Sequence, residues 1–296
     1  MLRLRVLTAL VLAPLVVWGV IALPEIWYAA GLAAAMCIGA WEWGRLCGLD
    51  RPWARAGYVL FILACMALAG ASVSLEDWAL PVLLGLAVLW WLLAVRLVAR
   101  YRGADEAPAG MPDGRGSESM HGPMRGRLSG AMVGIVVLVA PWTALVALGM
   151  VSLPGSERLG RYLVLFLLLL MWVADSGAYF AGRCWGRHKL APRVSPGKTW
   201  EGVWGALAGT VILAVLAAPV FDMTPRYVIL FALLCLVTVA FSILGDLIES
   251  LFKRQAGVKD SSHLLPGHGG MLDRIDSLTA AAPVFMLGML ALGLPQ

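Results

Sequence analysis

Long apolar runs recur from one end of this chain to the other, and several approach the roughly 20 residues that a helix needs to cross a bilayer. Across the whole sequence 60% of the residues are hydrophobic and only 14% are charged, with a mean hydropathy of +0.83. A chain of this composition buries its apolar surface in lipid rather than in one soluble core. The sequence therefore predicts an all-α, polytopic integral membrane protein.

Nine such runs can be separated by polar segments. The predicted spans are about 4–22, 26–46, 56–75, 78–99, 129–151, 160–182, 201–220, 227–250 and 275–294. The segment 101–127 is rich in Gly, Pro, Ser and charge, which is typical of a linker. We therefore expect a four-span part (1–100), a cytoplasmic linker loop (101–127) and a five-span catalytic part (128–296).

The distribution of basic residues predicts the orientation. If the N-terminus is cytoplasmic, all but three of the 23 lysines and arginines fall on the cytoplasmic side, the exceptions being Arg158, Arg161 and Arg226. The opposite orientation would reverse this distribution and violate the positive-inside rule. We therefore expect a cytoplasmic N-terminus. As a separate expectation, the protein is assigned to a bacterial inner membrane.

The net charge of +5 could suggest nucleic acid as a partner in a soluble protein. Here the basic residues lie in short loops between spans, and the sequence contains no basic helix or aromatic platform of a nucleic-acid-binding type. We therefore expect no nucleic-acid partner. In the N-terminal part, Glu42 lies three residues before Arg45, and a helix-surface ion pair is the simplest interpretation.

The stretch from Asp246 to Ser277 concentrates polar residues in an otherwise apolar chain. Burying ionised groups is costly unless they are paired or bind a cation, so this stretch is the candidate active site. Its first residues, Asp246, Glu249, Ser250 and Lys253, follow the spacing i, i+3, i+4, i+7 and share one helical stripe. A self-neutralising stripe is the alternative, but Asp246 follows a long apolar run where solvation is poor.

A second group of carboxylates opens the last predicted span. Asp273 and Asp276 are three residues apart on one helix, and Asp273 could face Asp246 across the gap. Carboxylates from two helices would repel each other unless a hard cation lay between them, and Mg²⁺ suits such oxygen ligands. The basic residues nearby would neutralise substrate phosphates: Lys198, Lys253, Arg254, Lys259, His268 and Arg274. This inventory indicates phosphoryl or nucleotidyl transfer at a metal.

Two further clusters of polar residues lie at the predicted cytoplasmic ends of membrane spans. Asp175 and Tyr179 are four residues apart and share a helix face, although Asp175 could instead cap a broken helix or pair with an arginine. In the segment 195–202, Pro196 and Gly197 predict a turn, and Lys198 with Thr199 would then begin a helix whose N-terminus suits phosphate. A simple Thr N-cap is compatible with the same role.

From Ser250 to Asp276 the order of polar residues is similar to the signature of the phosphatidate cytidylyltransferases, or CDP-diacylglycerol synthases. The matching residues are Ser250, Lys253, Arg254, Lys259, Asp260, Pro266, His268, Gly269, Gly270, Asp273, Arg274 and Asp276. The segments around Asp175 and Lys198 resemble further parts of the family. One departure is Gly197, because family members often carry two consecutive lysines there.

The resemblance implies condensation of CTP with phosphatidic acid to CDP-diacylglycerol and pyrophosphate at the cytoplasmic face of the membrane. It also implies Mg²⁺, a potassium ion in some members, and a homodimer. The expected catalytic residues are Asp246, Lys253, Asp273 and Arg274, and the expected metal ligands are Asp246, Asp273 and Asp276. The expected substrate-binding residues are Asp175, Tyr179, Ser195, Lys198, Thr199, Ser250, Arg254, Lys259, Asp260, His268, Gly269 and Gly270.

Two alternatives remain open at this point. A CTP-dependent enzyme acting on another lipid phosphate or a polyprenol would share the nucleotide and differ only in the lipid. An ion-coupled transporter could use Asp175, Asp246 and Asp273 as a cation path. The many basic residues at span ends, suited to phosphate, disfavour this second alternative.

Overall fold

The computed structural model describes residues 2–100, 127–152, 156–262, 264 and 269–293. Within these ranges the chain forms nine helices, which confirms the predicted all-α architecture. They are α1 (Leu2–Ala22), α2 (Glu25–Leu46), α3 (Pro52–Leu75), α4 (Ala79–Arg100), α5 (Arg127–Gly149), α6 (Leu159–Trp185), α7 (Trp200–Ala217), α8 (Pro225–Gln255) and α9 (Leu272–Leu292). Almost all of the predicted linker 101–127, and the site residue His268, lie outside the described residues.

Seven of these helices, α3 to α9, are long and apolar enough to cross a membrane. The other two are α1, in which a shorter apolar stretch, Leu10–Ala22, stands out, and α2, which is rich in Ala, Gly and Trp. The nine predicted segments thus all form helices, and seven of them have the length and hydropathy of a span. The chain is a helical integral membrane protein.

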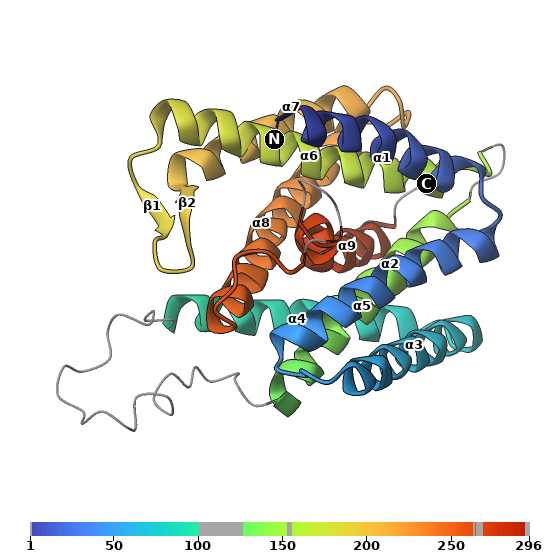
Figure 1. Cartoon of the computed structure of the whole chain (residues 1–296). Coiled ribbons are helices and arrows are strands. Elements are labelled where there is room, and N and C mark those ends of the chain that lie inside the picture. Colours follow the sequence, from blue (N-terminus) through green and yellow to red (C-terminus); the bar gives the residue numbers. More distant parts are fainter. Residues whose placement is uncertain (1, 101–126, 153–155, 263, 265–268, 294–296) are drawn as a thin grey trace.

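The helices α8 and α9 pack against each other in the middle of the molecule (Figure 1). On one side of them lie α1, α6 and α7, and on the other lie α2, α3, α4 and α5 (Figure 1). A run of α9 from Leu278 to Met286 is almost completely buried, because its small side chains allow neighbouring helices to approach closely. The central pair is therefore the scaffold that carries the candidate site residues.

Glycine brings α6 and α7 into direct backbone contact. A Cβ atom at Gly205 of α7 would collide with the carbonyl oxygen of Gly177 and with the Cβ of Ala181, both on α6. Farther along, Gly202 lies against the carbonyl oxygen of Ala178 in the same way. Small residues at these crossings permit the close approach that is typical of helices in membranes.

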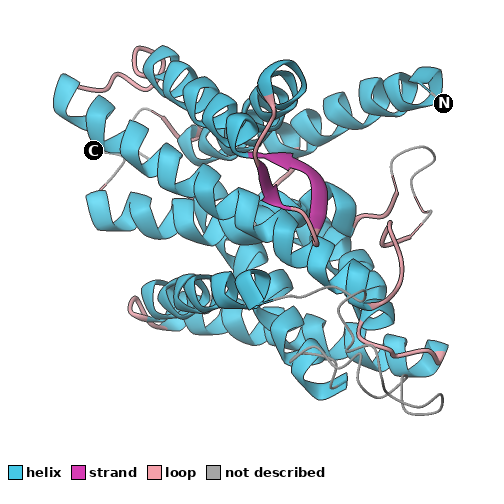
Figure 2. Ribbon diagram, turned by 90° about the vertical axis from the view of Figure 1, so that its left-hand side faces the viewer, coloured by secondary structure: helices cyan, strands magenta, loops and turns pink. Residues whose placement is uncertain are grey.

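Between α6 and α7 the chain forms a two-stranded antiparallel hairpin, β1 (Lys189–Ala191) and β2 (Ser195–Thr199). It lies on the surface of the helical bundle that faces the viewer in Figure 2. The predicted turn at Pro196 and Gly197 is wrong, since both residues lie in β2 and the turn is at 192–194. Thr199 is the N-cap of α7, and its hydroxyl oxygen accepts a hydrogen bond from the Gly202 amide at 3.1 Å.

Candidate active site

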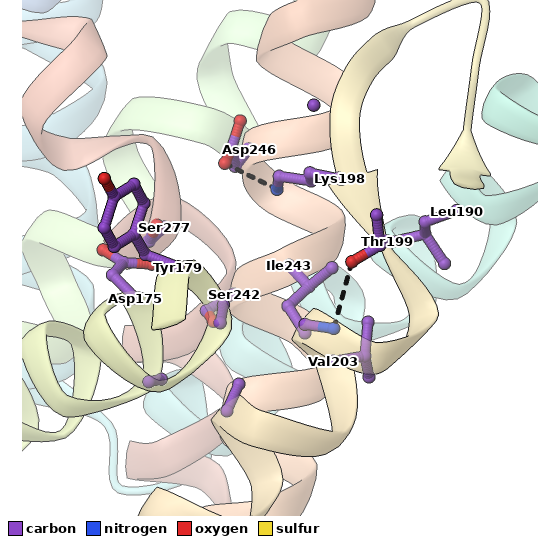
Figure 3. Close-up of a pocket in the computed structure, with 15 residues that line it drawn as sticks. Asp175, Tyr179, Leu190, Lys198, Thr199, Val203, Ser242, Ile243, Asp246 and Ser277 are labelled. Carbon is purple, nitrogen blue, oxygen red and sulfur yellow. Dashed lines mark hydrogen bonds and ion pairs between the residues drawn. The ribbon is translucent and has the colours of Figure 1, made fainter. Parts of the chain in front are cut away.

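The site contains two cavities that adjoin α8. The first, of about 160 Å³, is enclosed by α6, α7, α8, the start of α9 and the hairpin. Apolar and small residues form most of its wall, and Asp175, Tyr179, Lys198, Ser242 and Asp246 supply polar groups (Figure 3). A cavity of this kind can hold an apolar group together with one anionic head.

Lys198 and Asp246 meet in this first cavity. The Lys198 Nζ atom lies 2.5 Å from Asp246 Oδ2 (Figure 3). The Ser250 hydroxyl donates to Asp246 Oδ1 at 3.2 Å. Both charged side chains keep about a quarter of their surface exposed, 25% for the lysine and 29% for the aspartate. Solvent and substrate can therefore still reach the pair, and the hairpin is what brings the lysine to α8.

The second cavity, of about 260 Å³, is lined almost entirely by charged side chains. Its lining residues are Ser250, Lys253, Arg254, Lys259, Asp260, Asp273, Arg274 and Asp276. All eight were predicted site residues, and the structure brings them together although they span two helices and the intervening loop. Four cations beside three aspartates make this cavity suitable for a polyphosphate and its counter-cation.

Asp273 is the most extensively bonded carboxylate of the second cavity. Its Oδ1 atom lies 2.7 Å from Lys253 Nζ, and its Oδ2 atom accepts hydrogen bonds from the Gly270 amide at 2.7 Å and the Ser261 amide at 3.0 Å. The Ser261 hydroxyl lies 2.9 Å from the same oxygen. Lys253 also lies 3.2 Å from Glu249, so one buried lysine serves two carboxylates.

The predicted stripe on α8 is confirmed by these contacts. Ser250 binds Asp246 and Lys253 binds Glu249, each across one helical turn. The residues do more than neutralise one another, however, because Lys198 and Asp273 come from other elements to complete the pairs. The stripe is therefore the line along which the hairpin and α9 are joined to α8.

The remaining predicted residues lie around these cavities. Tyr179 points its hydroxyl oxygen toward Arg183 Nη1 at 2.5 Å, and Arg254 Nε donates to the Val194 carbonyl in the hairpin turn at 3.3 Å. Ser195 begins β2 but does not line either cavity. Gly269 has a left-handed φ of 82°, which favours glycine there.

One residue in contact with this region was misread from the sequence. Glu42 was expected to pair with Arg45 on the surface of α2, but in the described part of the chain its carboxylate is buried and binds the segment before α9. The local i, i+3 spacing pointed to Arg45, while the true partners are more than 200 positions away. The only sequence signal was a carboxylate within an apolar helix.

Three aspartates of the site interact electrostatically. Asp246 is close enough to Asp175 and to Asp276 for their charges to repel one another. Among the residues that the structure describes, no three acidic, His or Cys side chains form a ready-made metal cage. Mg²⁺ suits this situation, because it commonly takes one or two carboxylates and completes its shell with water and substrate phosphates.

Seven membrane-type helices in the described part of the chain, together with a cavity lined by four cations, define a membrane-embedded protein with a site suited to phosphate groups. The cytidylyltransferase family profile matches residues 3–292, and the chain belongs to this family. It is 42% identical over 293 residues to the phosphatidate cytidylyltransferase of Pseudomonas aeruginosa, covering 99% of this chain and 98% of that protein. The phosphatidate cytidylyltransferase of Haemophilus influenzae is 38% identical over 295 residues, with 96% and 97% covered. That of Bacillus subtilis is 37% identical over 163 residues, covering 54% and 59%.

Proposed function

We propose that this protein condenses CTP with phosphatidic acid, giving CDP-diacylglycerol and pyrophosphate. The observation that carries the proposal is the pair of cavities along α8, one mostly apolar with a Lys198–Asp246 pair and the other lined by cations and aspartates. A lipid phosphate requires an apolar wall with a polar end, and a nucleoside triphosphate requires several cations. The full-length likeness to proteins named phosphatidate cytidylyltransferase supports the same reaction.

In this reaction an oxygen of the lipid phosphate attacks the α-phosphorus of CTP. A new P–O bond forms there, the bond to the β-phosphate oxygen breaks, and pyrophosphate leaves with its electron pair. The attacking phosphate is already an anion near neutral pH, so no protein base is required. The task of the site is to hold two anions together and to stabilise charge on the leaving group.

We assign these tasks to the charged residues at the two cavities. Lys198 holds the lipid phosphate or the α-phosphate in the first cavity, where it contacts Asp246. Lys253 and Arg274, with Arg254 and Lys259, neutralise the triphosphate and the leaving pyrophosphate in the second cavity. Asp175 and Tyr179 line the first cavity, where they would orient the head of the lipid.

We further propose that Asp246, Asp273 and Asp276 hold Mg²⁺, with K⁺ as a candidate second cation. When bound, Mg²⁺ supplies a Lewis acid that stabilises negative charge on the phosphate oxygens. The hard carboxylate oxygens and the repulsion of Asp246 by its neighbours support this assignment. Lys198 and Lys253 neutralise two of these aspartates in the structure described here.

The bacterial relatives also support a location in the inner membrane. We propose that the site faces the cytoplasm, where CTP is found, because the positive-inside rule orients the chain that way. Contacts of Glu42, Lys198 and Lys253 gather the C-terminal ends of α2 and α8, the hairpin and the start of α9 at one end of the bundle. We also propose a homodimer.

The reaction is tested with purified protein, radiolabelled CTP and phosphatidic acid, with and without Mg²⁺. The expected result is lipid-extractable cytidine and an equal amount of pyrophosphate, formed only when the metal is present. Replacement of phosphatidic acid by a polyprenol or a polyprenyl phosphate tests the lipid. Labelled product with the polyprenyl substrate but not with phosphatidic acid would overturn the proposed lipid specificity.

A further inference from the structure

The carboxylate of Glu42 joins the two ends of the segment that precedes α9. Its Oε1 atom accepts hydrogen bonds from the Ser262 hydroxyl at 2.5 Å and the Met271 amide at 3.0 Å. Its Oε2 atom accepts from the Ser261 hydroxyl at 3.0 Å and the Leu272 amide at 2.8 Å. Each oxygen thus binds one group before the segment 263–270 and one group after it.

Burial makes this arrangement energetically important. Glu42 is only 3% exposed, and a buried carboxylate is tolerated when several donors replace its water. The next residue fixes the helix that carries it, because Trp43 donates from Nε1 to the Gly130 carbonyl at 2.9 Å and its ring lies 4.6 Å from that of Phe252. Glu42 therefore presents its oxygens from a helix that is held against α5 and α8.

The same segment holds Asp273. The Ser261 hydroxyl lies 3.0 Å from Glu42 Oε2 and 2.9 Å from Asp273 Oδ2, so a single hydroxyl lies between the two carboxylates. Gly270, whose amide donates to Asp273, leaves no room for a side chain, because a Cβ there would collide with Ser261 Oγ and with both Glu42 oxygens. The positions of Glu42 and Asp273 are therefore coupled through Ser261 and Gly270.

We propose that Glu42 is a positioning residue for the reaction, contributed by the N-terminal part of the chain. It fixes both ends of the segment before α9 and thereby the donors that orient Asp273 toward Lys253. The proposal rests on the proposed function in one respect, namely that Asp273 belongs to the catalytic site. Glu42 itself lines neither of the two cavities and acts through Ser261 and the backbone.

The test variant is Glu42→Gln, which keeps the size of the side chain and replaces one acceptor oxygen by a donor NH₂ group. At least one backbone amide, that of Met271 or Leu272, then faces a donor. The matched control is Glu25→Gln, at the exposed first turn of the same helix. A second variant, Ser261→Ala, removes the hydroxyl between the carboxylates and leaves Glu42 its two backbone amides.

Two measurements are made on each purified variant in detergent. Steady-state kinetics over a Mg²⁺ titration should show that Glu42→Gln lowers kcat at least about tenfold and raises the Mg²⁺ concentration for half-activation, with little change in the KM for CTP. Ser261→Ala should shift the same two parameters, and the double variant should be hardly worse than Glu42→Gln. In Glu42→Gln, hydrogen–deuterium exchange should increase in peptides covering residues 259–276. The control Glu25→Gln should match the wild type in both measurements.

The outcomes separate this inference from the proposed function. Loss of activity in strict proportion to loss of folded protein, with an unchanged Mg²⁺ curve, would make Glu42 merely structural and overturn the inference. If Glu42→Gln fails to fold, Ser261→Ala decides by the same criteria. If the wild type makes no lipid-linked cytidine, the proposed function fails. The positioning role is then judged by hydrogen–deuterium exchange alone, and exchange in residues 259–276 that is the same in Glu42→Gln as in the wild type would reject it.

Discussion

At the scale of single residues, the site is built from lysines that each hold a carboxylate from another element. Lys198 reaches Asp246 from the hairpin, and Lys253 reaches Asp273 across the start of α9. The two pairs differ in burial, since Asp246 keeps 29% of its side-chain surface and Asp273 only 7%. The exposed pair can exchange partners with substrate easily, while the buried pair also maintains the structure.

Lys198→Ala should reduce kcat/KM for the overall reaction by at least about tenfold. The change removes the one lysine among the described residues that line the first cavity, which is the proposed partner of a substrate phosphate. The Mg²⁺ requirement should change much less. Lys189→Ala is the matched control, since Lys189 lies on the opposite strand of the hairpin and lines neither cavity. Equal effects of the two changes would show that Lys198 acts only through net charge.

Asp246→Asn and Asp273→Asn should each abolish nearly all turnover, and the double variant should be hardly worse than either one. Such non-additivity is expected of residues that act as one unit. Asp273→Asn should also lower the melting temperature more, because it weakens a buried ion pair and leaves Lys253 with Glu249 alone. Modest, independent losses that excess Mg²⁺ leaves unaltered would contradict a shared cation.

At the scale of elements, local sequence patterns predicted the helices well and the contacts between distant elements poorly. Each predicted span became a helix, because hydropathy over about 20 residues is a strong local signal. The hairpin was missed because β2 contains Pro196 and Gly197, which normally indicate a turn. The pairing of β2 with β1, and the ion pair between Lys198 and Asp246 of α8, depend on tertiary contacts that short sequence patterns do not contain.

The close crossing of α6 and α7 is expected to be sensitive to a single methyl group. Gly205→Ala should destabilise the protein by about 1–3 kcal/mol, because the new Cβ would collide with backbone that cannot move locally. Activity should fall as well, since both helices line the first cavity. Gly85→Ala, in the middle of α4 with open space around it, should be neutral or slightly stabilising. Thermal unfolding in detergent compares the two variants.

At the scale of the whole molecule, the sequence located the candidate site but not all of the elements that build it. Residues from Asp246 to Asp276 were expected together, and the second cavity is lined by eight of them. The contribution of α2 was not foreseen, because Glu42 and its partners are separated by more than 200 residues. The N-terminal part of the chain, whose sequence carries little evident chemistry, supplies a buried carboxylate to the segment before α9.

The proposed orientation can be tested with cysteines at opposite ends of the bundle. Cys184, an exposed thiol at the end of α6, should be protected from a membrane-impermeant maleimide in intact cells and labelled once the membrane is opened. Thr224→Cys, at the exposed start of α8, should be labelled in intact cells. The reverse pattern would place the catalytic end outside and invalidate the orientation.

The pairing of Asp246 with Lys198, and of Asp273 with Lys253, has a consequence for how ligands enter. A divalent cation arriving alone meets carboxylates whose charge is already balanced, and a nucleotide arriving alone meets lysines already engaged. If the cation binds these aspartates and the nucleotide binds these lysines, as proposed, each ligand once bound releases the partner that the other needs. On that proposal, cation and nucleotide affinities are thermodynamically linked, and each ligand strengthens the binding of the other by the same factor.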